Sequence, residues 1–218
     1  MSGDVPVRDA ATVILLRAGS GGPAALMGQR GARAAFMPSK VVFPGGAVEP
    51  GDADARFARP LADACRAALA RDATVAPEAL AAAALRELAE ETGQVLGRPW
   101  NGDGPGCAWP GFAGLLPDAG ALRFAFRAVT PPGRPRRFDA RFFVAHAEDL
   151  ATDPDDFAAA EEELSHLRWV PLAEAAALDV PFVTEVALAE VRASLEGGPP
   201  PGGVPFLDNR DGAAVRRL

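Results

Sequence analysis

The chain has 218 residues, of which 22 are basic and 29 acidic, for a formal net charge of −7. A chain of this length can bury the core of one domain without disulfides or a structural metal. Its negative charge argues against a protein that binds nucleic acid or anionic membranes through a basic surface. No apolar run approaches the roughly 20 residues that cross a bilayer, and Met1 to Asp9 contain no basic segment leading into an apolar one.

The two cysteines, Cys65 and Cys107, are too few for a secreted disulfide framework, and neither has the spacing of a metal ligand. We therefore expect a protein of the reducing cytoplasm. Lys40 is the only lysine among the 22 basic residues. Because this bias towards arginine extends over the whole chain, the position of an arginine, not the number of arginines, has to indicate phosphate binding.

The first half of the chain predicts a β-hairpin followed by a helix. Residues 11–17 and 24–30 read as strands around a glycine-rich turn, and a third apolar run ends at Pro44-Gly45-Gly46. After a polar, Asp-rich stretch, a helix is expected from Pro77 to Gly93. Proline in the first turn and glycine just past the end are typical of helix boundaries.

The second half begins with a Gly- and Pro-rich loop over residues 100–119 and ends in a second helix over residues 181–195. Three strands are expected between them, over residues 122–129, 137–147 and 167–172. The sequence GGPPPGGVP that follows cannot continue a helix. We therefore expect residues 198–218 to form a tail that packs through Val204 and Phe206.

Three glutamates crowd the last two turns of the first predicted helix. Glu87, Glu90 and Glu91 stand at positions i, i+3 and i+4, so their carboxylates share one face. Like charges at this spacing repel each other, and the helix dipole disfavours each of them by roughly 0.3–1 kcal/mol. Arg86 alone carries too little positive charge to compensate them.

A solvated acidic face is one interpretation of this cluster, and a site for a divalent cation is another. Mg²⁺ takes oxygen ligands, keeps several waters and is normally shared between a few carboxylates and the phosphates of a substrate. The turn Pro44-Gly45-Gly46 favours the second interpretation. Its glycines lack a Cβ atom and let the backbone approach an ion or a ligand closely.

Together, the turn and the helix resemble the signature of the Nudix hydrolase family, G-x5-E-x7-R-E-U-x-E-E-x-G-U, in which U is apolar. Residues 86–93 match this signature position for position, and the final apolar position holds Gln94. Counting back from Arg86, the first glutamate of the signature falls on Glu78. Gly46 then lies 40 positions before Arg86, far more than the signature allows, which predicts an insert at about residues 52–77.

The resemblance implies an α/β protein, the Nudix-type α/β/α sandwich with a mixed sheet, built as a single domain over residues 1–197. It also implies a hydrolase that cleaves the diphosphate of a nucleoside diphosphate linked to another moiety. Long inserts occur in a branch that includes coenzyme A diphosphatases, which makes coenzyme A or acyl-CoA the first substrate candidate. That branch carries R-x3-G-x3-F-P-G-G, whereas Ala35 and Ser39 stand at two of these positions. Sugar nucleotides, dinucleoside polyphosphates and oxidised nucleotides therefore stay open.

The resemblance also implies a cofactor and roles for particular residues. The cofactor is Mg²⁺ or Mn²⁺, and its implied ligands are Glu87, Glu90, Glu91 and the carbonyl of Gly45. Arg86 would orient a ligating carboxylate. The proton of an attacking water would pass to Glu91, to Glu90 or to a residue of a distant loop. For that distant base we select Glu163, in the acidic run before residues 167–170.

Basic and aromatic residues are candidates for binding the substrate, because arginine forks bind phosphate oxygens bidentately. The predicted substrate contacts are Arg30, Arg33, Gly46, Arg136 and Arg137, with Lys40, Arg134 and Arg141 as further members of the same basic sets. His146 and His166 are expected to end or flank strands. Trp100, Trp109 and Phe112 either stack on a base or cover the core.

Two other functions on the same fold stay open. A non-catalytic nucleotide-binding or regulatory Nudix domain would commonly lack signature carboxylates, which are all present here. A diphosphate isomerase would need a catalytic cysteine near a glutamate, but Cys65 falls in the insert and Cys107 in a loop. In every case the expected partner is a small molecule, with no nucleic acid and no membrane, and family analogy suggests a homodimer.

Overall fold

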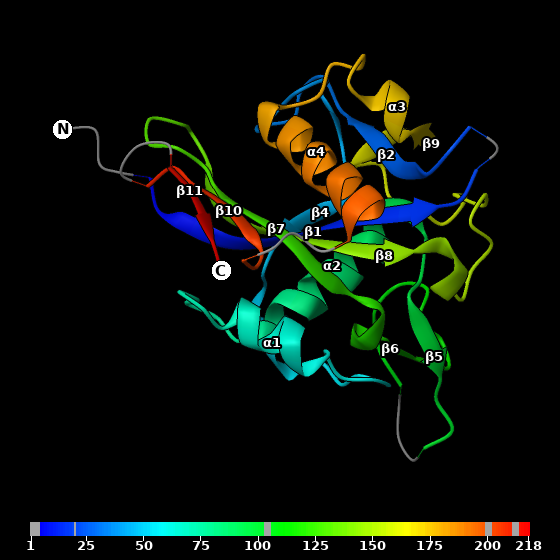
Figure 1. Cartoon of the computed structure of the whole chain (residues 1–218). Coiled ribbons are helices and arrows are strands. Elements are labelled where there is room, and N and C mark those ends of the chain that lie inside the picture. The colour runs from blue at the N-terminus through cyan, green and yellow to red at the C-terminus, as the bar shows by residue number, and fades with distance from the viewer. Residues whose placement is uncertain (1–4, 20, 103–105, 199–201, 211–213) are drawn as a thin grey trace.

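A mixed β-sheet forms the centre of the molecule (Figure 1). The computed structural model describes residues 5–19, 21–102, 106–198, 202–210 and 214–218. Nine strands of this described part form the sheet: β1 (Val7–Arg17), β2 (Ala24–Arg30), β3 (Val41–Val42), β4 (Gly45–Ala47), β7 (Arg123–Val129), β8 (Arg137–His146), β9 (Leu164–Pro171), β10 (Pro205–Asp208) and β11 (Ala214–Arg217). β5 (Gly97–Pro99) and β6 (Leu115–Pro117) form a separate antiparallel pair.

Strand β1 lies in the middle of the sheet and has neighbours of both orientations. It runs parallel to β8 along ten residues and antiparallel to β2 and β4. The order across the sheet is β11-β10-β7-β8-β1-β2-β3, with β4 also paired to β1 and β9 to β2. The expectation of a mixed sheet is confirmed.

Helices cover both faces of the sheet, as Figure 1 shows. The α-helices are α1 (Asp63–Leu69), α2 (Pro77–Thr92), α3 (Leu172–Ala175) and α4 (Phe182–Gly197), and the 3₁₀ helices are η1 (Pro50–Asp54), η2 (Ala119–Ala121) and η3 (Ala147–Asp149). No helix in the described part of the chain is long and apolar enough to span a membrane.

The side chains of β1 point alternately to the two faces of the sheet, so this one strand contributes to the hydrophobic core on each face. Val13 and Leu15 pack with the apolar residues of α2, whereas Ile14 and Leu16 pack with those of α4 on the opposite face. Successive side chains of a strand point to opposite faces, so an uninterrupted apolar run indicates a strand that is covered on both sides. The result is the expected α/β/α sandwich.

Helix α2 carries the acidic cluster and is the longest element on its face of the sheet. It begins at Pro77 and is followed by Gly93, which has a left-handed conformation with φ of 71°. Residues 79–84 are all buried, and five of these six are alanine. Small side chains let α2 approach β1 and β4 closely, which brings its last turns next to the glycines of β4.

The insert and the C-terminal segment are more ordered than expected. The sequence predicts a polar, Asp-rich insert over residues 52–77, and the structure shows that this insert contains part of η1 and all of α1. Residues 198–218 were predicted to be a tail, but β10 pairs with β7 and β11 pairs with β10. Phe206 of this segment is completely buried, as predicted. The loop over residues 100–119 also includes β6 and the start of η2.

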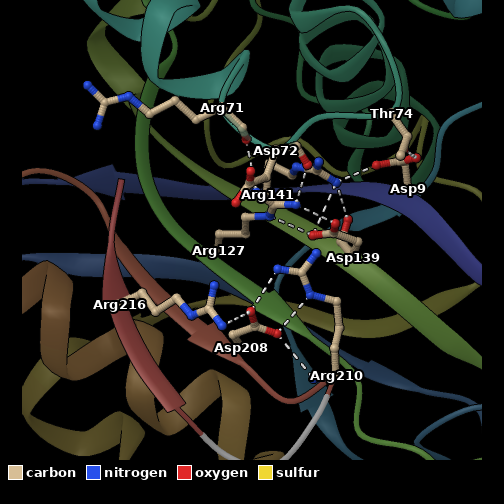
Figure 2. A network of polar contacts seen from close by, with 10 residues as sticks. All are labelled: Asp9, Arg71, Asp72, Thr74, Arg127, Asp139, Arg141, Asp208, Arg210 and Arg216. Atoms are coloured by element: carbon tan, nitrogen blue, oxygen red, sulfur yellow. Dashed lines mark hydrogen bonds and ion pairs between the residues drawn. The ribbon is translucent and has the colours of Figure 1, made fainter.

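A buried polar network holds the insert against the sheet (Figure 2). Arg127 of β7 donates hydrogen bonds to the carboxylate of Asp139 and to the carbonyls of Arg71 and Asp72. These carbonyls follow the C-terminal end of α1, where the helix dipole favours a cation. Phe206 of β10 covers the Arg127 guanidinium at 4.4 Å, so β10 closes the network from the other side.

Candidate active site

Glu91 lies where the end of α2 meets β4. Its Oε2 accepts a hydrogen bond of 2.7 Å from the N–H of Gly45, and its Oε1 is buried without a hydrogen-bond partner. The residue is only 2 % exposed. Burial raises the pKa of Glu91 to about 8 against the opposing effect of the Gly45 hydrogen bond, and the charges of Glu87 and Glu163 raise it further.

The glycines of β4 let the strand lie directly against this helix end. A Cβ atom on Gly46 would lie 2.2 Å from Oε1 of Glu87, and one on Gly45 would lie 2.5 Å from the carbonyl oxygen of Ala11. Neither position has room for a side chain. The two glycines are therefore required because the backbone of β4 lies in close contact with β1 on one side and with the acidic face of α2 on the other.

Arg86 forms ion pairs with Glu87 and Glu90, the other two carboxylates of the acidic cluster. Its Nη1 donates to Oε1 of Glu87 and to Oε2 of Glu90, each at 2.9 Å. Its Nε and Nη2 form a bidentate pair with Asp52 at 3.0 and 3.1 Å, and Nη2 also donates to the carbonyl of Ala47. Burial alone would lower the pKa of Arg86, but the hydrogen bonds that it donates to Asp52 and the charges of the nearby carboxylates raise this pKa above its ordinary value.

Asp52 is a member of the site that sequence reasoning missed. We had expected Glu78 to be the first acidic residue of the signature, but Glu78 pairs with Arg66 of α1 at 3.1 Å and lies in the first turn of α2, far along the helix from Arg86. Asp52 is 1 % exposed and is the bidentate partner of Arg86. It follows Gly46 by the x5 spacing of the signature, so counting forward from the glycine would have found it. The insert therefore lies between Asp52 and Arg86.

Glu163 and Arg30 form an ion pair beside the same cluster. Arg30 ends β2 and Glu163 directly precedes β9, and the pairing of these two strands brings their side chains to 2.9 Å. Arg30 also donates to the carbonyl of Phe36. The charge of Glu163 raises the pKa of both Glu87 and Glu91, whereas Arg30 lowers that of Glu91. The structure thus brings together Glu87, Glu91, Glu163 and Arg30.

The other predicted arginines lie elsewhere or are already engaged. Arg141 is 1 % exposed and pairs with Asp9 and Asp139, so it is not available to a phosphate. Arg137 is buried at the start of β8 and donates to the carbonyls of Thr130 and Val5. Its substrate contact remains a prediction without support from these hydrogen bonds. Arg33, Arg134 and Arg136 are exposed in loops, and their contacts to a substrate also remain predictions.

The remaining candidate residues, two histidines, a lysine and three aromatic residues, lie in strands, in an ion pair, in the core or partly buried in a loop. His146 ends β8, as predicted. His166 was expected to flank a strand but lies inside β9, because this strand begins at Leu164 and not at Leu167. Lys40 forms an ion pair with Asp179. Phe112 is completely buried and covers the core, whereas Trp100 and Trp109 are only partly buried.

The donor set fits a hard divalent cation. Among the described residues, no three acidic, histidine or cysteine side chains form a ready-made metal-binding group. Mg²⁺ does not need one, because it keeps several waters and binds through one or two carboxylates together with substrate phosphates. The unpartnered, buried Oε1 of Glu91 is the oxygen that such an ion would satisfy. Glu87 and Glu90 supply further oxygens beside it.

The raised pKa values predict how the stability of the metal-free protein depends on pH. Glu87 has a pKa of about 7 and Glu91 of about 8, against an ordinary value of 4.5, so the folded state binds more protons than the unfolded state between these limits. The free energy of unfolding should therefore fall as the pH rises from about 5 to 8. Urea titrations in a chelator measure this slope.

The variant Glu91→Gln should flatten that dependence, because it removes the group with the higher pKa. The control variant Glu185→Gln changes an exposed acid in the first turn of α4 and should leave the slope unchanged. If the free energy of unfolding of the wild type stays constant over this pH range, burial does not raise the pKa of Glu87 and Glu91 as described.

Comparison with known proteins identifies the family. No family model matches the sequence. No curated protein matches it either. The structure is similar to a Nudix hydrolase from Alicyclobacillus acidocaldarius, with 31 % sequence identity, a TM-score of 0.63, and coverage of 85 % of this chain and 90 % of the other. The chain belongs to the Nudix hydrolase family, whose members act as pyrophosphohydrolases.

Two more distant structures share the fold. An Ap4A hydrolase from C. elegans is 17 % identical with a TM-score of 0.51, covering 88 % of this chain and 99 % of the other. The Nudix domain of NrtR from Shewanella oneidensis, solved with ADP-ribose, is 14 % identical with a TM-score of 0.51, covering 87 % and 89 %. At these identities the similarity shows the fold alone.

Proposed function

We propose that this chain is a divalent-metal-dependent hydrolase that cleaves the diphosphate of a nucleoside diphosphate linked to another moiety. The observation that carries this proposal is the buried Oε1 of Glu91, which lacks a hydrogen-bond partner beside Glu87 and Glu90. A lone carboxylate oxygen in the interior is costly unless a cation or a hydrogen-bond donor satisfies it. A metal-bound diphosphate is the ligand that fits both the chain's family and this acidic cluster.

The residues around the proposed metal site would have different roles in catalysis. The N–H of Gly45 fixes one oxygen of Glu91 and leaves the other for the ion. Arg86, itself held by Asp52, fixes one oxygen each of Glu87 and Glu90. When bound, Mg²⁺ or Mn²⁺ would offset the charge on the phosphate oxygens and lower the pKa of the attacking water. The protein thus keeps its own carboxylates in place before the substrate arrives.

Glu163 is our candidate for the general base. Its side chain is 55 % exposed, so water can reach it, and its charge acts on both Glu87 and Glu91. The ion pair with Arg30 holds it at the edge of the cluster. A general base has to lie within one hydrogen bond, or one water, of the proton that it takes. Arg30, only 16 % exposed in its side chain, would at the same time turn its guanidinium towards a substrate phosphate.

The resemblance and the nucleotides named with the two distant structures suggest a class of substrate. Coenzyme A and acyl-CoA are suggested by the insert, while ADP-ribose and Ap4A are the nucleotides associated with the NrtR domain and the C. elegans hydrolase. We infer that a nucleotide with a diphosphate or polyphosphate linkage is the substrate. A non-catalytic nucleotide-binding domain is the alternative, against which the complete set of Arg86, Glu87, Glu90 and Glu91 argues.

A product assay tests this function. Coenzyme A, ADP-ribose, NADH and a dinucleoside polyphosphate are incubated with the full chain, with Mg²⁺, with Mn²⁺ and in a chelator, and the products are separated chromatographically. We expect two phosphate-bearing products from at least one compound, in the presence of metal only. Tight binding of one of these compounds without turnover would instead support the non-catalytic domain.

A further inference from the structure

Gln94 lies just after α2, at the position where the family signature has an apolar residue. Its side chain is completely buried, and both ends of its amide are paired. Oε1 accepts a hydrogen bond of 2.9 Å from Oγ1 of Thr152, and Nε2 donates to the carbonyls of Asp153 and Asp156 at 3.1 and 2.7 Å. Because a buried amide is costly without such partners, these three contacts account for a polar residue at an apolar position.

The three partners of Gln94 all belong to one loop, residues 150–163, which connects η3 to β9. The backbone next to Gln94 binds the same loop. The N–H of Val95 donates to Oγ1 of Thr152 at 3.2 Å, and the carbonyl of Val95 accepts a hydrogen bond of 2.8 Å from the N–H of Ala151. The loop is therefore fixed to the segment that follows α2, and Gln94 supplies its side-chain contacts.

The far end of this loop brings three more glutamates, residues 161–163, to the end of α2. The N–H of Glu161 donates a hydrogen bond of 2.8 Å to the carbonyl of Glu90, one of the last carbonyls of α2, which have no partner within the helix. Beside it, the loop packs so closely on Gly93 that a Cβ atom there would lie 3.2 Å from the Cβ of Ala159. Glu163 is thus only two residues from a direct contact with the helix that carries the acidic cluster.

Charge opposes this placement of residues 161–163. Burial raises the pKa of both Glu90 and Glu87, and the charge of Glu161 raises the first further, while the charge of Glu163 raises the second. Like charges at such short range repel each other. Without a bound cation, contacts that carry no charge of their own have to hold the loop in place. The amide of Gln94 provides such contacts, because it is neutral at every pH.

We propose that Gln94 is a positioning residue, whose amide holds the loop so that residues 161–163 lie beside the carboxylates of α2. The proposal rests on the proposed function, in which Glu163 is the candidate general base. A base has to lie within one hydrogen bond, or one water, of the proton that it takes. A displacement of about 1 Å, even one caused far from the reacting atoms, can cost about 100-fold in rate. Gln94 therefore acts on the reaction through the loop and not through the substrate.

Hydrogen exchange of the Glu161 amide, measured by NMR in a chelator, tests the positioning without turnover. Gln94→Leu restores the apolar residue of the signature and removes all three side-chain contacts. We expect it to speed this exchange by about tenfold or more, because local opening of the loop frees the amide. The control is Val191→Ala, which removes buried volume from the core on the other face of the sheet. It should lower the global stability and leave the exchange of Glu161 unchanged.

Steady-state kinetics test the effect on the reaction. Gln94→Leu should lower kcat about tenfold and change KM by less than about twofold, because the contacts of the substrate stay the same. Thr152→Val, which removes the hydroxyl that donates to Gln94, should act in the same direction, whereas Thr152→Ser keeps this hydroxyl and should restore the rate. In a Glu163→Gln background, Gln94→Leu should lower kcat by no more than about twofold, since the group that it positions is already lost.

Normal exchange of Glu161 in Gln94→Leu overturns the proposal, and so does faster exchange with an unchanged kcat. Equal acceleration in Val191→Ala, or a full tenfold loss of kcat in the Glu163→Gln background, also overturns it, because Gln94 would then act through general stability or through another group. A wild type that hydrolyses none of the panel compounds refutes the proposed function instead. Faster exchange in Gln94→Leu alone would in that case still support Gln94 as the residue that places the loop.

Discussion

Glu91→Gln is expected to lower kcat by about 100-fold or more on whichever diphosphate the wild type cleaves. The change is isosteric, so the hydrogen bond from Gly45 can persist, but the side chain loses the negative charge that a cation requires. Oε1 is the oxygen without a partner in the structure. Steady-state rates and the affinity for Mn²⁺, measured by paramagnetic relaxation, should decrease together.

The control for Glu91 is Glu185→Gln, an exposed residue on the opposite side of the sheet, which should keep both wild-type values. A Glu91→Gln variant with unchanged turnover would remove Glu91 from the proposed mechanism. An unchanged rate together with normal metal binding would leave only the family assignment in place.

Asp52→Ala is expected to destabilise the protein by about 3 kcal/mol and to lower activity by about tenfold or more. The substitution removes the bidentate partner of a buried guanidinium, and breaking a buried ion pair is costly because one charge loses its compensation. Arg86 would keep Glu87 and Glu90 but lose the group that orients it, and loss of such a supporting partner typically costs 10–100-fold. Urea denaturation and steady-state kinetics measure the two effects.

Glu78→Gln provides the comparison for Asp52. If Glu78 were the partner of Arg86, its variant would be the damaging one, whereas the structure places it in a half-exposed pair with Arg66. We expect Glu78→Gln to change stability by less than about 1 kcal/mol, as is usual for exposed ion pairs. The opposite ranking of the two variants would contradict the position of the insert.

Local signals were sufficient for most of the elements around the site. The strand over residues 24–30 was predicted with the observed bounds, and α2 begins at the predicted Pro77 and ends next to Gly93. Apolar runs, a proline in the first turn and a left-handed glycine act within a few residues of chain. The clustering of Glu87, Glu90 and Glu91 follows from the helical repeat in the same way.

Partners that lie far apart in the chain left weaker signals. Asp52 lies 34 residues before Arg86, and only the spacing counted forward from Gly46 indicates it. No local pattern indicates that the carbonyls of Arg71 and Asp72, just after α1, accept hydrogen bonds from Arg127 of β7. Strand β10 follows a run of Pro and Gly in the sequence, yet it pairs with β7 and buries Phe206 completely. From the sequence, Arg141 was a candidate to bind phosphate. The sequence does not show that its guanidinium forms ion pairs with Asp9 and Asp139.

The sequence by itself determined the family signature, the acidic face of α2, and the glycines that adjoin it, because these depend on residue type and short spacing. The tertiary structure alone decided which arginines are buried in ion pairs and how the C-terminal segment joins the sheet. These features depend on contacts between segments far apart in the chain. Such contacts exist only in the folded chain, where the sheet places the segments side by side, so no local pattern of residues indicates them.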